Sequence, residues 1–276
     1  MSIVVSDENV IIENVKNFDL DQTFDCGQCF RFEKTNETFT GIVSGKSIKL
    51  YQQNDKIIFQ NISYENFKEF WYDFFDLNTN YSEICSKLSE LHPILEKACS
   101  ECSGIRILKQ EPWETLCSFI ISQNNNIPRI KKIIRSLCTL YGEKTEYGFS
   151  FPGFKKIASL EISDLEPIKS GFRAKYILDA ARKVSNGFIN FETIKNLNYR
   201  DAKNSLMKIY GVGPKVADCV LLYGFHRLEA FPIDVWMKKI MNKFFKNESP
   251  DFFGKFAGIA QQYLYHYTRM HPEILE

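Results

Sequence analysis

The segment GVGPKVADC, residues 211–219, limits what this chain can fold into more than any other stretch of its sequence. The residues before it, YRDAKNSLMKIY, and those after its glycines, PKVADCVLLYGF, both carry apolar side chains at helical spacing. The two glycines and the proline between them favour a turn. The sequence therefore predicts two helices joined by a turn of three residues.

The residues of this turn suit a ligand as well as a bend. Gly211 and Gly213 allow positive φ angles and close approach by another molecule, and Pro214 fits the first position of a helix. Val212 can pack between the two helices. Free amides at a helix start, supported by the helix dipole, form a site for phosphate oxygens. The pattern is typical of a helix-hairpin-helix that grips a nucleic-acid backbone, although a plain helical connection with Lys215 in solvent has the same spacing.

Two charged residues near this turn indicate chemistry on a sugar. The positive end of the helix dipole disfavours a second positive charge at Lys215, and only a neutral amine attacks an electrophilic carbon. Asp234, in PIDVWMKKIM, precedes another helix, where its ordinary role is an N-cap. If that segment folds back over the hairpin, the carboxylate stabilises positive charge that develops on a sugar. The pair therefore points to a reaction at C1′ of a nucleotide.

The net charge of +1 hides an asymmetry between the two parts of the chain. Residues 1–100 carry 9 Lys and Arg against 16 Asp and Glu, whereas residues 101–276 carry 26 against 18. A basic C-terminal part can meet a polyanion such as nucleic acid. A solvated basic face has the same composition, so this signal is weak alone.

Neither the cysteines nor the hydropathy pattern indicates export, a membrane or a metal. The chain has 8 cysteines, including C-x-x-C pairs at 26–29 and 99–102, but no histidine accompanies either pair at zinc-finger spacing. Cys117 and Cys138 fall on apolar helix stripes, where a free thiol acts as a small hydrophobe. No run approaches the length of a spanning helix, and the start lacks an export signal. We therefore expect reduced thiols, no bound metal, and a cytoplasmic or nucleoid-associated protein.

The fold class follows from a change of periodicity along the chain. Residues 24–60 contain FDCGQCFRF, FTGIV, SIKLY and KIIFQ, which predict an antiparallel meander, and residues 62–103 are helical and aromatic. After residue 101 only helices are predicted, one of which starts at Pro128 and stops at Gly142. The sequence thus predicts an α+β fold, with a small sheet unit over 1–100 and an all-helical domain over 101–276.

The hairpin with Lys215, the FPIDVWM segment with Asp234, and CGQCFRF near the start resemble the 8-oxoguanine DNA glycosylase family of the helix-hairpin-helix superfamily. The resemblance runs through nearly the whole chain and implies a base excision repair enzyme. In such an enzyme Lys215 attacks C1′, the oxidised base departs, and the resulting Schiff base permits β-elimination that nicks the strand, while Asp234 stabilises the sugar cation. It implies no organic cofactor. No cysteine follows Cys219, so no iron–sulfur cluster is expected either.

The same resemblance assigns residues to the damaged base. Oxidation at C8 converts N7 of guanine from an acceptor into an N–H donor, and the backbone carbonyl of Gly27 is expected to accept from it. A strand or turn glycine needs no ligand, so this role requires structural support. Gln261 is expected to read the Watson–Crick edge, and the base is expected to lie between Cys219 and Tyr265. The family more often has phenylalanine at the position of Tyr265.

Four further residues are assigned by the resemblance to the duplex around the extruded base. Asn124, in SQNNNIPRI, is expected to fill the gap, and Arg129 to contact the orphaned cytosine. Phe172, where the family commonly has tyrosine, is expected to act as a wedge, and Arg173 as a second cytosine contact. Trp236 stands where the family usually has histidine.

The expected partner is double-stranded DNA that contains 8-oxoguanine opposite cytosine, bound by a monomer. Two alternatives stay open at this point. A monofunctional glycosylase for alkylated or mismatched bases needs Asp234 but not Lys215, and it releases a base without cutting the strand. A non-catalytic DNA-binding module needs only the hairpin, and it binds without releasing a base.

Overall fold

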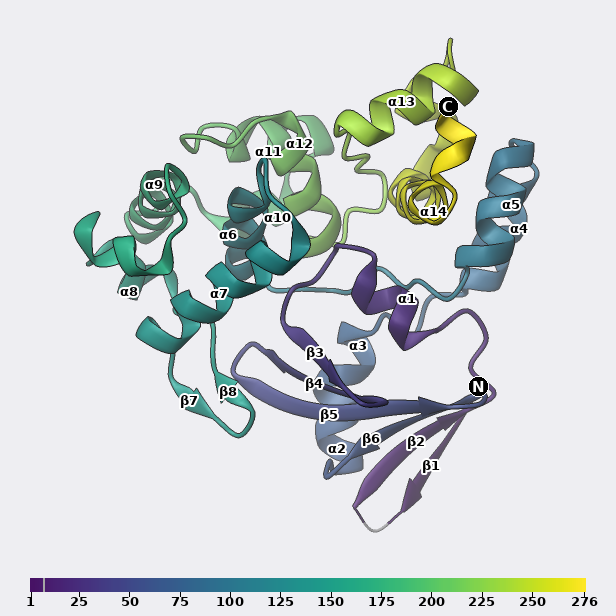
Figure 1. Ribbon diagram of the computed structural model, residues 1–276, viewed down its shortest axis with the longest axis horizontal. Helices are drawn as coiled ribbons and strands as arrows, with labels where there is room; N and C mark the ends of the chain where they lie inside the picture. The colour runs from purple at the N-terminus through teal and green to yellow at the C-terminus, as the bar shows by residue number, and fades with distance from the viewer. Residues whose placement is uncertain (7) are drawn as a thin grey trace.

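The structure is a computed structural model that describes residues 1–6 and 8–276. It combines an N-terminal sheet with a larger group of helices (Figure 1), so the α+β prediction is confirmed. The sheet has six antiparallel strands in the order β1-β2-β6-β5-β4-β3. Their bounds are β1 (Ser2–Ser6), β2 (Asn9–Glu13), β3 (Phe32–Thr35), β4 (Thr38–Val43), β5 (Lys46–Gln53) and β6 (Lys56–Gln60).

One face of the sheet carries an aromatic core. Phe39, Leu50 and Phe59 face one another on β4, β5 and β6 in register, and all three are buried. The Phe67 ring lies 4.9 Å from that of Phe59, so the helical segment after β6 closes the core over this face. That segment consists of α2 (Tyr64–Asn66), the π-helical turn η1 (Phe67–Trp71) and α3 (Tyr72–Phe74).

The prediction that the sheet starts at Phe24 is wrong. Residues 24–31 do not form a strand, because Asp19 caps helix α1 (Leu20–Asp25) by accepting a hydrogen bond of 2.8 Å from the amide of Gln22. Gly27 then adopts a φ of 81°, which breaks an extended chain. The structure also adds β1 and β2, which the sequence reasoning did not predict. The strands β4, β5 and β6 confirm the predicted meander.

The helical part surrounds a second, larger core. The predicted limits of one helix are confirmed: Pro128 lies in the first turn of α7, and the amide of Gly142 closes the helix on the carbonyl of Cys138 at 2.7 Å. The helices before the hairpin are α4 (Tyr81–Ser89), α5 (Pro93–Cys102), α6 (Pro112–Ser122), α7 (Ile127–Tyr141), α8 (Phe154–Ala158), η2 (Ser163–Ile168), α9 (Arg173–Ser185) and α10 (Phe191–Asn196). The rest are α11 (Tyr199–Leu206), α12 (Pro214–Cys219), η3 (Val220–Gly224), α13 (Val235–Phe244), η4 (Pro250–Phe256), α14 (Ala257–Met270) and η5 (Pro272–Leu275).

The helical part is not free of strands, which corrects the all-helical prediction. A short hairpin pairs β7 (Lys144–Thr145) with β8 (Gly148–Phe149) directly after α7. Gly148 has a φ of 145°, which a side chain would strain, so the turn depends on glycine. Two residues per strand are too few to show the alternation by which strands are recognised in a sequence.

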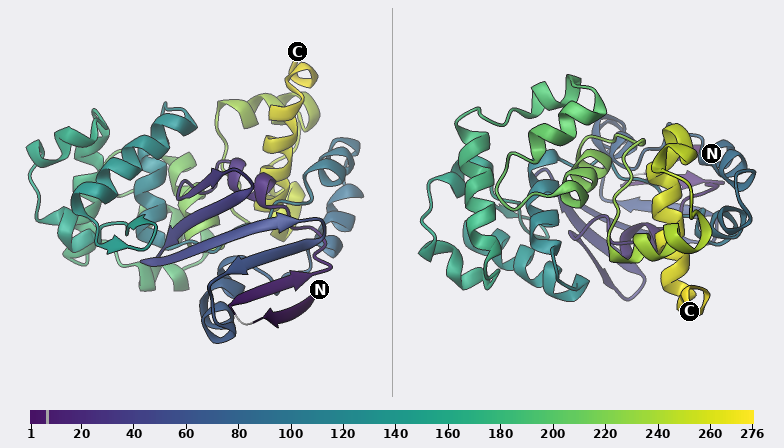
Figure 2. Two further views of the ribbon diagram at one scale, coloured as in Figure 1. Left: turned by 60° about the horizontal axis from the view of Figure 1, so that its bottom comes forward. Right: turned by 90° about the horizontal axis from the view of Figure 1, so that it is seen from above.

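The last helix joins the two parts of the chain. Figure 2 shows α14 beside α5 and above the N-terminal segment, although these segments are far apart in the sequence. Helices α4 and α5 share the core of the helical part rather than that of the sheet. The boundary near residue 100 stays a prediction. Among the described residues no helix has both the length and the apolar character needed to cross a bilayer.

Candidate functional site

The predicted hairpin is present, but its turn is longer than expected. Helix α11 ends at Leu206, so residues 207–213 connect it to α12. Gly211 has a φ of 80°, as predicted, and a Cβ there would clash with the ring of Tyr176. Gly213 has a φ of −94°, so it does not use the positive φ that glycine allows. A Cβ on Gly213 would meet nothing within 4 Å, so its backbone is open to an approaching ligand.

A buried carboxylate fixes the two helices of the hairpin to each other. Asp218 on α12 accepts hydrogen bonds from the Tyr199 hydroxyl (2.6 Å) and the Lys203 amine (2.8 Å), both on α11. Burial raises the pKa of Asp218, and these two donors oppose that effect. Val212 in the turn is 5% exposed, as expected for a side chain between the helices. No role was predicted for Asp218, although it lies three residues after Lys215 on the same helix.

Lys215 lies in the first turn of α12, close to a thiol and an aromatic ring. Its amine nitrogen is 5.2 Å from the centre of the Phe119 ring. Burial raises the pKa of the Cys219 thiol to about 11, and the nearby charge of Lys215 lowers it only in part. Cys219 is therefore a neutral thiol at neutral pH, which offers an uncharged contact rather than a competing nucleophile.

Asp234 is the N-cap of α13, as predicted. Its Oδ1 accepts a hydrogen bond of 2.7 Å from the amide of Met237. After the larger effect of burial, the negative charge of Asp234 contributes to raising the pKa of both Cys219 and Tyr265. The carboxylate, Lys215, the thiol and the phenol thus share one electrostatic neighbourhood, although they come from three helices.

Helix α14 supplies two of the predicted base contacts. Gln261 is 5% exposed, and its buried Oε1 has no hydrogen-bond partner among the described residues. A buried acceptor without a donor is costly, so this atom suits a ligand that brings one. Tyr265 lies one turn later, partly buried, with the Arg269 guanidinium 5.7 Å from its ring centre.

Gly27 lies in the turn between α1 and β3. Within residues 1–6 and 8–276 no donor hydrogen-bonds to its carbonyl oxygen. The next residue, Gln28, is fully buried and donates to the carbonyls of Thr23 (3.0 Å) and Arg106 (2.7 Å). Its Oε1 accepts from the amide of Leu108 at 2.9 Å. The glycine carbonyl is thus free, on a turn that is tightly held.

A buried arginine holds the loop of residues 123–126 between α6 and α7 in place. Arg173 is 5% exposed and donates to the backbone carbonyls of Gln123 (2.9 Å), Asn124 (3.0 Å) and Ser170 (3.1 Å). Asn124 is exposed and has a φ of 47°. Arg129 is exposed on the first turn of α7. The structure thus gives Arg173 a loop-holding role that the sequence did not indicate, and its contact with cytosine stays a prediction.

Two aromatic residues of the predicted site differ in their exposure. Phe172 precedes α9, is 49% exposed, and lies 4.5 Å from the Arg173 guanidinium. Trp236 on α13 is partly buried, and its indole N–H donates to the hydroxyl of Thr268 on α14 at 2.7 Å. That N–H is therefore already used between two helices.

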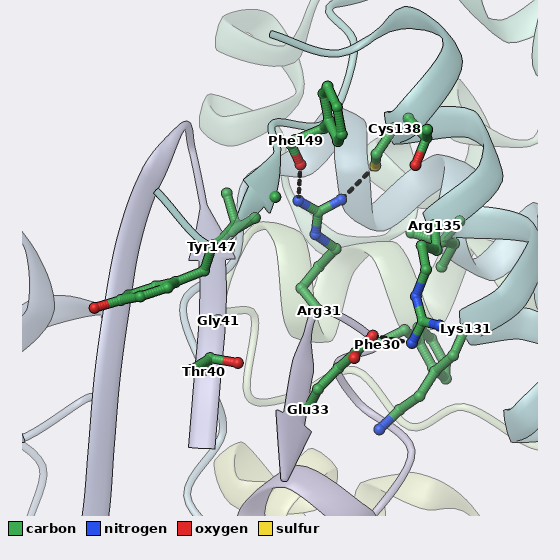
Figure 3. Close-up of a pocket in the computed structure, with 14 residues that line it drawn as sticks. Phe30, Arg31, Glu33, Thr40, Gly41, Lys131, Arg135, Cys138, Tyr147 and Phe149 are labelled. Carbon is green, nitrogen blue, oxygen red and sulfur yellow. Dashed lines mark hydrogen bonds and ion pairs between the residues drawn. The ribbon is translucent and has the colours of Figure 1, made fainter. Parts of the chain in front are cut away.

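A cavity of about 390 Å³ lies apart from these residues, between the β3–β4 edge, α7 and the β7–β8 hairpin (Figure 3). Arg31 reaches into it and donates to the Cys138 sulfur and the Phe149 carbonyl. Arg31 also faces Glu114 at 3.5 Å. These bonds make it part of the wall, and the cavity shares no residue with the predicted site.

The fold and this lysine–aspartate arrangement define a DNA glycosylase of the helix-hairpin-helix class. Residues 117–251 match the family model described as HhH-GPD superfamily base excision DNA repair protein, and residues 10–116 match that of the 8-oxoguanine DNA glycosylase N-terminal domain. The chain belongs to the 8-oxoguanine DNA glycosylase family.

Solved structures and a curated relative agree with this assignment. MBOgg1, in complex with a low-affinity DNA ligand, is 38% identical with a TM-score of 0.93, over 98% of this chain and 99% of that one. The Clostridium acetobutylicum 8-oxoguanine glycosylase/lyase, in complex with dsDNA containing cytosine opposite 8-oxoG, is 39% identical with a TM-score of 0.92, over 99% of both chains. The N-glycosylase/DNA lyase of Saccharomyces cerevisiae is 43% identical over 156 residues, or 51% of this chain. The match spans 42% of the length of the yeast protein.

Proposed function

We propose that this chain removes 8-oxoguanine from double-stranded DNA and then cuts the strand at the resulting site. The observation that carries the proposal is the position of Lys215 at the start of the second hairpin helix, in the same electrostatic neighbourhood as Asp234. The similarity to the Clostridium acetobutylicum 8-oxoguanine glycosylase/lyase over 99% of the chain supports the same activity.

The reaction proceeds through a covalent intermediate on Lys215. The neutral amine attacks C1′, the bond between C1′ and N9 breaks, and the base leaves with the bonding electrons and takes up a proton. The Asp234 carboxylate stabilises the positive charge on the sugar as this bond breaks. The sugar ring opens to a protonated Schiff base, loss of a proton from C2′ follows, and the 3′ phosphate is eliminated. Hydrolysis of the Schiff base then regenerates the amine.

The site reads the lesion from two directions. The free carbonyl of Gly27 accepts from N7–H of 8-oxoguanine and repels the lone pair that guanine has at the same atom. The unpartnered Oε1 of Gln261 accepts from the N–H groups of the Watson–Crick edge. The base lies between the neutral thiol of Cys219 and the ring of Tyr265, and the exposed base edge provides the donors that the protein lacks.

The remaining residues hold the duplex. The open amides of Gly211 and Gly213 bind the phosphate backbone. Asn124 fills the gap, Phe172 wedges the stack, and Arg129 reads the orphaned cytosine, while Arg173 holds the backbone carbonyl of Asn124 in place. The protein binds this duplex as a monomer.

Borohydride trapping tests this proposal. The protein is mixed with a duplex that contains 8-oxoguanine opposite cytosine, and borohydride reduces any Schiff base to a stable protein–DNA bond. We expect a covalent band for the wild type and for Lys97→Gln, an exposed lysine on α5, but none for Lys215→Gln. Base release without a trapped band supports a monofunctional glycosylase. Binding without base release supports a DNA-binding module.

A further inference from the structure

A buried glutamine ties the last helix to the turn that carries Gly27. Gln262 on α14 is 1% exposed. Its Nε2 donates to the carbonyl of Cys26 at 2.9 Å, and its Oε1 accepts from the hydroxyl of Tyr223. Both functional atoms of the amide are therefore bonded. The two partners lie on separate segments, the α1–β3 turn and η3.

The carbonyls on either side of Gly27 are both held by amide side chains. Gln262 donates to the carbonyl of Cys26, and Gln110 donates to that of Gln28 at 2.8 Å. The carbonyl of Gly27, between them, has no protein donor in the described part of the chain. A free acceptor between two fixed peptide groups has a defined direction, because its neighbours cannot rotate without losing buried hydrogen bonds.

Tyr223 connects both of these glutamines to the nucleophile. Its hydroxyl donates to Oε1 of Gln262, and its backbone carbonyl accepts a hydrogen bond of 3.0 Å from the backbone amide of Gln110. Its ring stacks on that of Phe119 with centres 5.3 Å apart, and the Lys215 amine lies 5.2 Å from the centre of the same Phe119 ring. One buried frame thus sets the direction of the Gly27 carbonyl relative to Lys215.

We propose that Gln262, through Tyr223 and the Cys26 carbonyl, is a positioning residue that gives the Gly27 carbonyl its ability to tell 8-oxoguanine from guanine. This inference rests on the proposed function. A carbonyl aimed at N7 attracts the donor of the lesion and repels the lone pair of guanine. A carbonyl that turns away loses both effects, so selectivity falls more than general activity does.

The test uses three variants of the full chain. Gln262→Leu removes both amide bonds at similar volume, and Tyr223→Phe removes one hydroxyl bond while keeping the stack on Phe119. Tyr263→Phe is the matched control, because Tyr263 is an equally buried neighbour on α14 whose hydroxyl donates to the carbonyl of Ile105 at 3.2 Å instead. Melting temperatures show which variants are folded.

Two single-turnover rates are measured for each variant. The first is excision of 8-oxoguanine opposite cytosine, and the second is strand cutting at a preformed abasic site, which needs Lys215 but reads no base. We expect Gln262→Leu to slow excision by about tenfold, the size of one misplaced neutral hydrogen bond, and to slow cutting by less than about threefold. Tyr223→Phe is expected to lie between Gln262→Leu and the wild type, and Tyr263→Phe to match the wild type.

A substrate analogue sharpens the comparison. In 8-oxo-7-deazaguanine a C–H group replaces N7–H, so the Gly27 carbonyl has no strong donor to accept from. Gln262→Leu is expected to weaken binding of the lesion by about tenfold, but binding of this analogue by less than about threefold.

The inference is overturned if Gln262→Leu weakens binding of the lesion and of the analogue by the same factor, or slows excision and abasic-site cutting by the same factor. It is also overturned if a folded Gln262→Leu variant excises 8-oxoguanine as fast as the wild type. If Gln262→Leu does not fold, Tyr223→Phe decides by the same ratios. The wild type separates the two proposals: if it neither excises nor becomes trapped, the proposed function fails, whereas a failure confined to the ratios leaves that function standing.

Discussion

The guanidinium of Arg173 donates a hydrogen bond of 3.0 Å to the backbone carbonyl of Asn124, the residue proposed to enter the duplex. The same guanidinium also holds the carbonyls of Gln123 and Ser170. An arginine that the sequence suggested as a reader of cytosine therefore supports the loop beside it. Arg129 lies in the first turn of α7, directly after this loop, and its side chain is exposed.

Lysine substitutions separate these two arginines, because lysine keeps the charge but not the planar set of donors. Arg173→Lys is expected to slow excision of 8-oxoguanine by a similar factor opposite cytosine and opposite adenine, since the loop itself is loosened. Arg129→Lys is expected to slow it about tenfold opposite cytosine and little opposite adenine. Single-turnover excision on the two duplexes measures this. A loss confined to cytosine in Arg173→Lys would restore its role as a direct reader.

The two glycines of the hairpin are expected to respond differently to alanine. Gly211→Ala meets the Tyr176 ring and a φ of 80°, so we expect the protein to lose about 1–3 kcal/mol of stability. Alanine can adopt the φ of −94° at Gly213, and its Cβ would meet no atom within 4 Å, so Gly213→Ala should change stability by less than about 0.5 kcal/mol. DNA affinity should fall, because the added methyl group stands where the phosphate backbone is proposed to approach. Thermal melts and DNA titrations check both. Unchanged DNA affinity in Gly213→Ala would show that the duplex does not approach this backbone.

Features that depend on neighbouring residues were predictable from the sequence. The hairpin and the Asp234 cap follow from short-range spacing, since a glycine pair and a carboxylate before a helix act within one turn. FDCGQCFRF misled because it alternates like a strand, while the Asp19 cap and the φ of Gly27 produce a helix and a turn.

Features that join distant segments were not predictable. The bond from Gln262 to Cys26 spans 236 residues, and no local pattern distinguishes Gln262 from its neighbour Gln261. One amide is fully bonded inside the protein and the other has a free acceptor. The packing of α14 against the α1–β3 turn and against η3 sets this difference.

Asp234 caps α13 and is proposed to stabilise a sugar cation, and one pair of substitutions can separate these two roles. Asp234→Asn keeps an oxygen that can accept from the amide of Met237, so the cap and the fold should persist. Its neutral side chain no longer stabilises a sugar cation, and excision is expected to fall by about 100-fold or more. Asp234→Ala loses the cap as well, at about 1 kcal/mol of stability. Melting curves and excision rates are compared for both variants, and wild-type excision by Asp234→Asn would remove its charge from the mechanism.

Glu114 on α6 is expected to make the stability of the protein depend on pH, away from the site. Burial raises the pKa of this carboxyl group from 4.5 to about 7, and the Arg31 guanidinium 3.5 Å away lowers it only in part. Below about pH 4.5 the group is protonated in both the folded and the unfolded states. As the pH rises from 4.5 to 7, the unfolded state loses this proton first, so the folded state loses stability, by about 3 kcal/mol at most.

Glu114→Gln has no proton to lose at this position. Its free energy of unfolding, relative to that of the wild type, should therefore increase as the pH rises from 4.5 to 7 and level off above 7. Urea unfolding of both proteins across this range measures the difference, and the other titrating groups cancel between them. Parallel curves would mean that the carboxyl group has the same pKa in both states, either through a stronger pairing with Arg31 or through water that reaches it.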